Sequence, residues 1–246
     1  NKAAATVALG SLAQTYDGTL KPATATTNPA DLPVTFTYNG SADVPTDAGS
    51  YVVVGTVNDG NYQGSASDTL IIDKAASTTT VTGGTFTYTG SSHLATVSVT
   101  GAGGLSLSPI PTYSGGCVAA PINVSETIPT ACTAEYTYSG DTNHYGSNGS
   151  DTIVITKADA SIVVNGYTGT FDGSEHGAIL VSALGVNSED LSASVNLDAT
   201  FINVPGGIAH WTFTDVAGNY NNTGGDVDII VYKADAAIEV TGYTGE

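Results

Sequence analysis

SDTLIIDKA, residues 67–75, is a short apolar strand that runs into a Lys-Ala pair, and it recurs as SDTIVITKA at 150–158 and DVDIIVYKA at 226–234. A self-similar segment at a recurring distance is typical of a repeat array, in which one structural unit is copied along the chain. Lys2 and Ala3 lie a similar distance before the first segment, so we expect the chain to begin on a further copy of this Lys-Ala hinge. The hinge therefore divides the chain into units.

The hinges predict three domains and the start of a fourth. The predicted ranges are 1–75, 76–158 and 159–234, and each is of a size that commonly folds alone. The remaining residues, DAAIEVTGYTGE at 235–246, match DASIVVNGYTGT at 159–170, which opens the third unit. We therefore expect 235–246 to be the first strand of a truncated fourth repeat.

The composition excludes several classes of partner. With 5 Lys+Arg against 23 Asp+Glu the net charge is −18, whereas a nucleic-acid backbone or an anionic membrane requires concentrated positive charge. No apolar run approaches the ~20 residues of a membrane span, so we expect no membrane insertion. The first residues lack the basic and apolar regions of a signal peptide, and we expect the chain to be mature or cut from something longer.

The residue pattern predicts an all-β protein. Thr, Ser, Gly, Val and Tyr suit short strands and tight turns, and we find no convincing amphipathic helix. Asp17-Gly18 is a hairpin signal, and Val34, Phe36 and Tyr38 alternate with threonines, the period of a half-buried strand. About seven short strands in a unit predict an antiparallel β-sandwich. A β-grasp unit is a lesser alternative, weakened by the missing helix.

The two cysteines, Cys117 and Cys132, fall within the second unit, about one hairpin apart. We interpret them as a disulfide, which implies an oxidising compartment. The alternative is a pair of unpaired buried thiols. A metal site is disfavoured because no His or Cys lies at ligand spacing nearby.

A tyrosine follows an Asn- or Asp-rich turn in each unit. We predict that it buries its ring and hydrogen-bonds its hydroxyl to nearby backbone, as in a tyrosine corner. These residues are Tyr62, Tyr145 and Tyr220, and counting back nine residues from each reaches the predicted core positions Val53, Tyr136 and Trp211. A role in stacking on a ligand is the alternative for the tyrosines.

Candidate chemistry is sparse. His93 and His176 occupy the position of Lys21 and mark a strand start that we expect to be exposed, and His144 and His210 precede aromatic residues. None predicts a triad or zinc site, which needs a base and an orienting partner in one pocket, so we expect no enzyme activity. The acidic residues offer a calcium hypothesis. Asp73, Asp159 and Asp235 lie at the hinges, where calcium would stiffen the array; alternatively they only keep the protein soluble.

The chain resembles the bacterial MBG and YDG-type repeats, Ig-like modules found in tandem in large secreted or surface-attached adhesins. The resemblance rests on TYDGTLKPATATT at 15–27, AGSYVVVGTVNDGNYQGSASDTLIIDKA at 48–75 and NGYTGTFDGSEHGA at 165–178. The second unit diverges, because Thr89 replaces the turn aspartate and a cysteine loop is inserted. The resemblance implies a tandem array of three small Ig-like antiparallel β-sandwiches, and it carries over no catalytic residue.

We therefore predict a structural stalk or spacer, extracellular or on a bacterial cell surface, whose partners are the neighbouring repeats of the same chain. One alternative is a binding module that recognises a glycan or another cell-surface ligand with exposed Tyr and Trp. A second is a self-assembling filament, in which residues 235–246 complete the sheet of another copy by β-augmentation. Each alternative keeps the β-sandwich fold.

Overall fold

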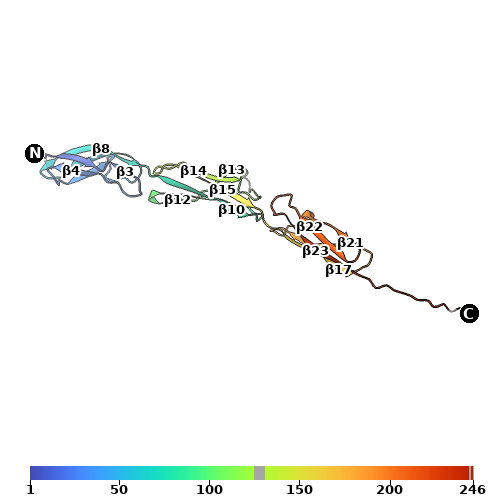
Figure 1. Cartoon of the computed structure of the whole chain (residues 1–246). Helices are drawn as coiled ribbons and strands as arrows, with labels where there is room; N and C mark the ends of the chain where they lie inside the picture. Colours follow the sequence, from blue (N-terminus) through green and yellow to red (C-terminus); the bar gives the residue numbers. More distant parts are fainter. Residues whose placement is uncertain (125–130, 244, 246) are drawn as a thin grey trace. The chain divides into compact units, whose positions relative to one another are not determined.

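The computed structural model describes residues 1–124, 131–243 and 245, and in these ranges the chain is all-β (Figure 1). Strands alternate with turns throughout, and the helical elements described are two single 3₁₀ turns, η1 at Ala102–Gly104 and η2 at Ser192–Ser194. The predicted fold class is confirmed. Within the described ranges the structure contains no helix with the length and hydropathy that a membrane span requires.

The chain divides into two compact units, each described by itself. The first comprises residues 1–84, 94–119 and 132–153, and the second comprises 85–93, 120–131 and 154–246. These units do not coincide with the ranges 1–75, 76–158 and 159–234, whose status as separate domains stays a prediction. We use the names repeat 1, repeat 2 and repeat 3 for those three ranges.

Repeat 1 contains a two-stranded and a four-stranded sheet. The smaller sheet pairs β2 (Thr6–Gly10) with β4 (Thr24–Asn28). The larger sheet has the order β3 (Ala13–Thr15), β8 (Ser65–Asp73), β6 (Gly49–Val57) and β5 (Val34–Tyr38). A short pair, β1 (Ala3–Ala4) with β7 (Tyr62–Gln63), holds the preceding Lys-Ala hinge.

Repeats 2 and 3 repeat this plan. In repeat 2 the sheets are β12 (Leu105–Leu107), β11 (Thr96–Gly101) and β9 (Ser77–Thr82), and β10 (Gly84–Thr87), β15 (Ser147–Thr156), β14 (Cys132–Tyr138) and β13 (Thr112–Gly115). In repeat 3 they are β16 (Ser161–Asn165) with β19 (Ile179–Leu184), and β17 (Tyr167–Thr170), β23 (Thr223–Tyr232), β22 (Gly206–Phe213) and β20 (Val195–Leu197). A further pair joins β18 (His176–Gly177) to β21 (Thr200–Phe201).

The larger sheets of repeats 1 and 3 are antiparallel except at one edge. There β3 pairs in parallel with β8, and β17 pairs in parallel with β23. Parallel neighbours cannot be joined by a tight hairpin, so the chain between them crosses the sandwich. In repeat 1 the opening segment does this by leaving β2 and entering β3 in the other sheet, so one stretch of sequence contributes to both layers.

The core follows the period of two along the central strands. Strand register places Val53 opposite Asp68, Ala134 opposite Asp151, and Ala209 opposite Val227. Val53, Ala134 and Ala209 are each 0% exposed, so this is the shared core position of the three repeats.

Two predicted core residues lie elsewhere on the same strand face. Tyr136 and Trp211 are only partly buried, two residues beyond Ala134 and Ala209 respectively. The turn after the central strand is longer in repeats 2 and 3, so counting back nine residues from the tyrosines stops two residues short of the shared position. Val53 alone of the three predicted residues occupies it.

The predicted disulfide is present. Cys117 and Cys132 are bonded with a Cα–Cα distance of 5.2 Å, and Cys132 opens β14 at 1% exposure. The bond therefore ties the loop after β13 to the first residue of a central core strand.

Replacing both cysteines by alanine is expected to lower the free energy of unfolding of repeat 2 by about 3 kcal/mol, because a disulfide spanning 15 residues restricts the unfolded chain. Calorimetry of the whole chain should show this as a lower midpoint temperature of one unfolding transition. Reduction of the wild-type protein should reproduce the fall, and reductant should have no effect on the double variant. An unchanged thermogram would contradict the prediction.

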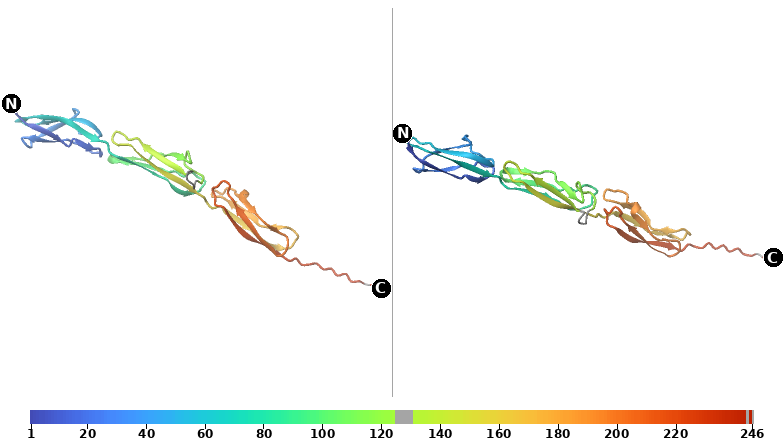
Figure 2. Two further views of the ribbon diagram at one scale, coloured as in Figure 1. Left: turned by 45° about the horizontal axis from the view of Figure 1, so that its top comes forward. Right: turned by 90° about the horizontal axis from the view of Figure 1, so that it is seen from above.

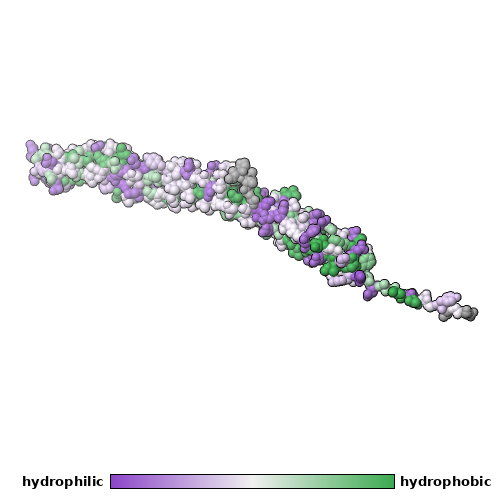
Figure 3. Space-filling view, in the orientation of Figure 1, coloured by the Kyte–Doolittle hydropathy of each residue, from purple (hydrophilic) through white to green (hydrophobic). Residues whose placement is uncertain are grey.

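The segment after β23 forms no strand in the described residues 233–243 (Figure 2). Ile238, Val240 and Tyr243 are 82%, 86% and 96% exposed, and apolar patches are visible on this segment in Figure 3. A strand is defined by hydrogen bonds to a neighbour, and this segment has none in the structure. Its assignment as an opening strand, and the filament hypothesis that uses it, stay predictions.

Candidate functional site at the Lys-Ala joints

The alanines of the first three Lys-Ala hinges each dock on a turn of the repeat that follows the hinge. The backbone N–H of each alanine donates to an asparagine carbonyl: Ala3 to Asn61 (2.7 Å), Ala75 to Asn143 (2.9 Å) and Ala158 to Asn219 (3.0 Å). The next residue of the turn forms a parallel bridge with the alanine, and the three bridge residues are Tyr62, His144 and Tyr220. The same backbone contact is therefore built three times.

An aspartate side chain within each of these turns binds the backbone of the turn. The Asp59 and Asp141 carboxylates each accept the N–H groups of the asparagine and of the bridge residue, at distances of 2.7 to 3.0 Å. In the longer turn of repeat 3, Asp215 accepts from Ala217 (2.9 Å) and Tyr220 (2.7 Å). Such side-chain-to-backbone bonds fix a turn locally and orient the carbonyls that receive the hinge.

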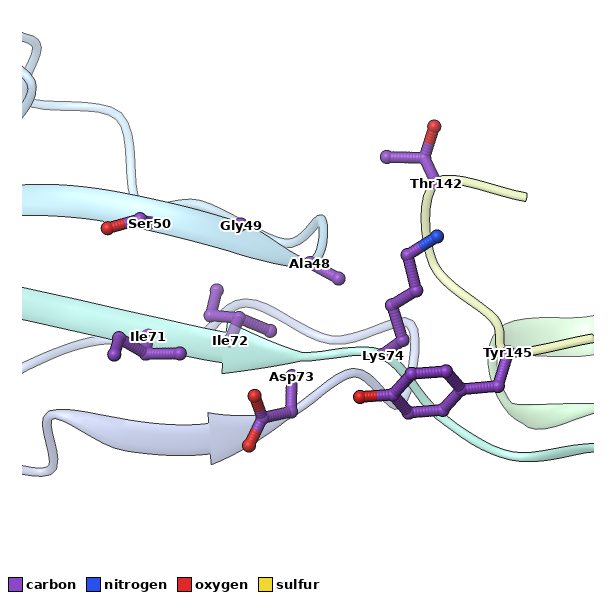
Figure 4. Close-up of a pocket in the computed structure, with 9 residues that line it drawn as sticks. All are labelled: Ala48, Gly49, Ser50, Ile71, Ile72, Asp73, Lys74, Thr142 and Tyr145. Carbon is purple, nitrogen blue, oxygen red and sulfur yellow. The ribbon is translucent and has the colours of Figure 1, made fainter. Parts of the chain in front are cut away.

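The hinge lysine adds a charged donor to the contact. Lys2 Nζ donates to the Asp59 carbonyl oxygen at 2.6 Å, and Lys74 Nζ donates to the equivalent carbonyl of Asp141. Figure 4 shows the Lys74 side chain extending toward the loop that carries Thr142. The ammonium group therefore binds the same turn that its neighbouring alanine binds.

The docking asparagine also uses its side chain, and it does so in the same way in two joints. Asn143 Oδ1 accepts the Ala48 N–H at 2.8 Å, and its Nδ2 donates to Asp47 Oδ1 at 2.9 Å. Asn219 Oδ1 accepts the Val124 N–H (3.1 Å), and its Nδ2 lies 3.4 Å from Asn123 Oδ1. A primary amide suits this position because it offers both an acceptor and a donor.

An aromatic contact accompanies the amide. The Tyr16 ring meets the His144 ring edge-on, with centroids 5.3 Å apart and an interplanar angle of 83°. Tyr88 meets Tyr220 at 5.5 Å and 82°. Neither tyrosine was predicted from the sequence to be a joint residue. Their signal was the recurring Thr-Tyr-x-Gly of 15–18 and 87–90, whose third copy carries Phe171.

The glycine after each joint tyrosine allows close approach. A Cβ on Gly18 would lie 2.6 Å from Gly103 Cα, and a Cβ on Gly90 would lie 2.1 Å from Asn187 Nδ2. Asn187 Nδ2 donates to the Thr89 carbonyl at 3.0 Å. Both glycines have positive φ, at +84° and +71°, so a side chain would be strained there as well as obstructed.

The residue three positions after this glycine closes the same turn. Lys21 Nζ lies 2.5 Å from Asp17 Oδ2, His93 Nε2 lies 3.1 Å from Thr89 Oγ1, and His176 Nε2 lies 3.0 Å from Asp172 Oδ1. Hydrogen bonds from Lys21 and then Thr19 lower the pKa of Asp17 to about 2. The expected exposed strand start is not what the structure shows, since Lys21 is 8% exposed and both histidines are half-buried, held by these pairs.

The predicted corner tyrosines have different surroundings. Tyr220 is buried, and its hydroxyl accepts the Val186 N–H at 3.0 Å and donates to the Glu189 carboxylate. Burial, and then Glu189, raises the pKa of Tyr220 to about 12. Tyr62 is half-buried, whereas Tyr145 is 57% exposed because His144 occupies the bridge position. The turn of repeat 2 places a histidine between the asparagine and the tyrosine, and this turns Tyr145 outward.

Two other tyrosines accept hydrogen bonds from backbone N–H groups with their hydroxyl oxygens. Tyr38 Oη accepts the Ala23 N–H at 2.9 Å, and Tyr113 Oη accepts the Ala95 N–H at 3.3 Å. The predicted type of interaction therefore exists in repeats 1 and 2 at a different position. The only sequence signal was a tyrosine at the end of one alternating strand.

The hinge aspartates do not converge. Asp73, Asp159 and Asp235 are exposed at separate hinges, and Asp159 Oδ1 accepts a hydrogen bond from Asn221 Nδ2 at 2.8 Å. Among residues 1–124, 131–243 and 245, no three His, Cys, Asp or Glu side chains are grouped so as to hold a metal ion. Calcium at the hinges stays a prediction without a carboxylate cluster to support it.

An open hollow of about 410 Å³ lies beside the joint of Lys74 and Ala75 (Figure 4). Ile71 and Ile72 supply its apolar lining, and Asp73 and Thr142 supply polar groups. The exposed Tyr145 ring projects from the repeat 2 loop toward these strands. The hollow thus combines an aromatic ring with a carboxylate and a hydroxyl.

Comparison with known proteins identifies one family. Residues 5–76 match the MBG domain family, which confirms for repeat 1 the resemblance inferred from the sequence. No curated protein resembles the chain closely enough to count as a relative.

Two solved structures align with most of this chain, at low sequence identity and with low TM-scores. A structure of Sidekick-1 immunoglobulin domains 1–5 is 11% identical with a TM-score of 0.26, and the alignment covers 93% of this chain and 59% of that structure. Drosophila N-cadherin EC1–4 is 10% identical with a TM-score of 0.27, covering 95% of this chain and 73% of that structure.

The close approach at Gly18 predicts a selective effect on the joint. Gly18→Ala and Gly40→Ala place a Cβ at φ values of +84° and +87°, but Gly40 has nothing within 4 Å. Both variants should lose about 1–2 kcal/mol to backbone strain. Gly18→Ala alone should also speed hydrogen exchange of the Ala75 amide, which docks on Asn143. Equal exchange in the two variants would show that the contact at Gly103 does not hold the joint.

Proposed function

We propose that this chain is a non-enzymatic structural spacer of an extracellular protein, a stalk of the kind found in bacterial surface adhesins. The observation that carries the proposal is the docking contact repeated at Ala3, Ala75 and Ala158. A contact that is built at three successive hinges serves to fix successive repeats. The MBG match over residues 5–76 and the disulfide, which favours an oxidising compartment, support the extracellular setting.

The proposed mechanism is mechanical. The hinges at Ala3, Ala75 and Ala158 are held by backbone bonds. A lysine adds to the first two of these joints, and an amide and an aromatic ring add to the last two, so bending a joint breaks several interactions together. The net charge of −18 opposes collapse and aggregation of the secreted chain. The four histidines each pair with one nearby polar partner or more, and we assign none of them a catalytic role.

The spacer proposal predicts that the Asn143 side chain stiffens the joint between repeats 1 and 2. Asn143→Ala removes two hydrogen bonds and leaves the Ala48 N–H without its acceptor, at a cost of roughly 1–3 kcal/mol. Residual dipolar couplings should then report different alignment for the two repeats, whereas the wild-type protein should give one common alignment. Asn148→Ala, on an exposed position of β15, is the matched control. Independent alignment in the wild-type protein would refute a stiff spacer.

A second candidate function is recognition of a glycan in the hollow beside Tyr145. Sugar-binding sites combine an aromatic face with carboxylate and hydroxyl groups, and Tyr145, Asp73 and Thr142 offer this set. The observation that favours it is the exposure of Tyr145, which the histidine in its turn creates.

The glycan candidate predicts binding that depends on Tyr145. On a glycan array, Tyr145→Ala should abolish any signal of the wild-type chain, while Tyr232→Ala should retain it. The control is matched, since Tyr145 and Tyr232 are both 57% exposed. Uniform absence of binding by the wild-type chain would reject this candidate and leave the spacer proposal standing.

A further inference from the structure

Asn39 and Gly40 are the two central residues of the tight turn that follows β5. Both have positive φ, at 50° and 87°, and the flanking residues Tyr38 and Ser41 form an antiparallel bridge. Two consecutive residues with positive φ at this position define a type I′ turn. Tyr38 and Ser41 exchange two backbone hydrogen bonds, at 2.6 and 3.0 Å, so the turn is closed at its base.

The Asn-Gly pair in this turn carries the groups that form a succinimide ring. The Gly40 nitrogen is the nucleophile, and the side-chain carbon Cγ of Asn39 is the electrophile. The Gly40 N–H has no hydrogen-bond partner among the described residues, and nothing lies within 4 Å of the place that a Cβ on Gly40 would occupy. The nucleophile is therefore unpaired and unobstructed.

The Asn39 side chain is held in a way that activates its carbonyl group. Oδ1 accepts the Val52 N–H at 2.8 Å, and the Asn39 N–H donates to the Val52 carbonyl oxygen at 2.8 Å. A donor aimed at a carbonyl oxygen stabilises the negative charge that develops there when a nucleophile adds to the carbon. The leaving group, Nδ2, has no partner in the described ranges and belongs to an exposed residue, so water reaches it.

The turn also permits the rotation that ring closure requires. The ring closes when Cβ of Asn39 eclipses the Gly40 nitrogen, which occurs at ψ of about −120°, the value of the first central residue in a type II′ turn. A type I′ turn holds this ψ near about +30°, and rotating the peptide unit between the two residues converts one turn into the other. The rotation takes φ of Gly40 from positive to negative, and glycine adopts both.

The same rotation breaks no hydrogen bond of the peptide unit that moves. Neither the Asn39 carbonyl oxygen nor the Gly40 N–H has a partner in the part of the chain that the structure describes. The bonds between Asn39 and Val52 use the Asn39 N–H and side chain, which lie outside the rotating unit. The reactive conformation is therefore accessible from the folded turn.

We propose that Asn39 is a site of spontaneous covalent modification, at which asparagine is converted into aspartate and isoaspartate. The Gly40 nitrogen forms a bond to Asn39 Cγ, the bond from Cγ to Nδ2 breaks, and ammonia leaves with the proton that the Gly40 nitrogen gives up. Water is the second reactant and opens the succinimide. Attack at Cγ breaks its bond to the Gly40 nitrogen and gives aspartate, whereas attack at the main-chain carbonyl carbon gives isoaspartate.

The two products have different effects on the turn. Aspartate retains an oxygen acceptor for the Val52 N–H and adds one negative charge. In isoaspartate the main chain runs through the side-chain carbons, so the link between Tyr38 and Ser41 becomes longer. Because the geometry of a tight turn depends on its length, isoaspartate should weaken the bridge between Tyr38 and Ser41. The modification is a property of the turn and does not depend on the proposed function.

Two further Asn-Gly pairs, at 148–149 and 165–166, provide an internal comparison. All three asparagines are exposed. Residues 148–150 also repeat the tripeptide Asn-Gly-Ser of residues 39–41. Exposure does not distinguish the three sites, and the reacting tripeptide does not distinguish the first two. A difference in reactivity between these two sites in the folded chain must therefore come from the structure around them.

The other two asparagines lie on strands. Asn148 pairs with Thr137 within β15, and Asn165 pairs with Ile179 at the end of β16. Strand pairing keeps ψ in the extended range, far from the value that ring closure requires. Rotating a peptide unit there also breaks ladder hydrogen bonds.

Both of these glycines are also obstructed by neighbouring backbone. A Cβ on Gly149 would lie 2.7 Å from the Thr79 carbonyl oxygen, and a Cβ on Gly166 would lie 2.1 Å from the Asp228 carbonyl oxygen. Gly40 has no such neighbour. The structure therefore favours reaction at Asn39 over the other two sites.

Peptide mapping by mass spectrometry after incubation of the whole chain at mildly alkaline pH tests the proposal. Conversion replaces an amide by a carboxyl group, so it is read as a mass gain at the individual site, and fragmentation separates aspartate from isoaspartate. Asn39 should convert roughly tenfold or more faster than Asn148 and Asn165, because these two must first lose strand hydrogen bonds.

Incubation of the same chain in denaturant is the matched control, since the three sites should then react at similar rates. Gly40→Ala, whose Cβ crowds the attacking nitrogen, should suppress conversion at residue 39 and leave the other two sites unchanged. Equal rates at the three sites of the folded chain, a preference for Asn39 that persists in denaturant, or unchanged conversion in Gly40→Ala would overturn the proposal. Each of these results would leave the dipolar-coupling test of the spacer function unaffected.

Discussion

The structure depends on a backbone hydrogen bond between a hinge alanine and an asparagine carbonyl. The bond is local to neither partner, because the hinge and its turn are separated by most of a repeat. An aspartate side chain holds the turn open to receive the alanine, and a lysine adds a second donor to the same turn. The backbone itself is the recognition element, which explains why the surrounding residues differ among the three copies while the contact persists.

Much of the fold was predictable from the sequence. Alternating apolar residues and Asp-Gly turns predicted short strands, the recurring Lys-Ala pair predicted repeated units, and the spacing of Cys117 and Cys132 predicted their bond. The parallel edge pairs were not predicted, because strand direction depends on where the opening segment crosses between sheets. The core position was predicted two residues too late in repeats 2 and 3, because the length of the turn varies among the repeats. An alignment anchored on Tyr145 cannot detect that His144 has taken its structural position.

The joints were the least predictable part of the site. The sequence marks the hinge but does not indicate what the hinge touches, since Asn143 and Tyr16 lie far from Ala75 along the chain. Paired features would have helped: a Thr-Tyr-x-Gly turn in one repeat and an Asp-x-Asn turn in the next are complementary surfaces. The hinge aspartates drew attention because of their charge, yet the aspartates that organise the joints lie inside the turns, where their carboxylates bind backbone N–H groups.

The distance along the chain between a hinge and its turn sets an order of assembly. Lys74 and its acceptor on Asp141 are 67 residues apart. The joint between repeats 1 and 2 therefore cannot close until the last hairpin of repeat 2 has formed. A chain that folds from its N-terminal end would therefore leave each hinge free until the following repeat is complete. The joints would therefore be completed one after another, in order from the N-terminal end of the chain.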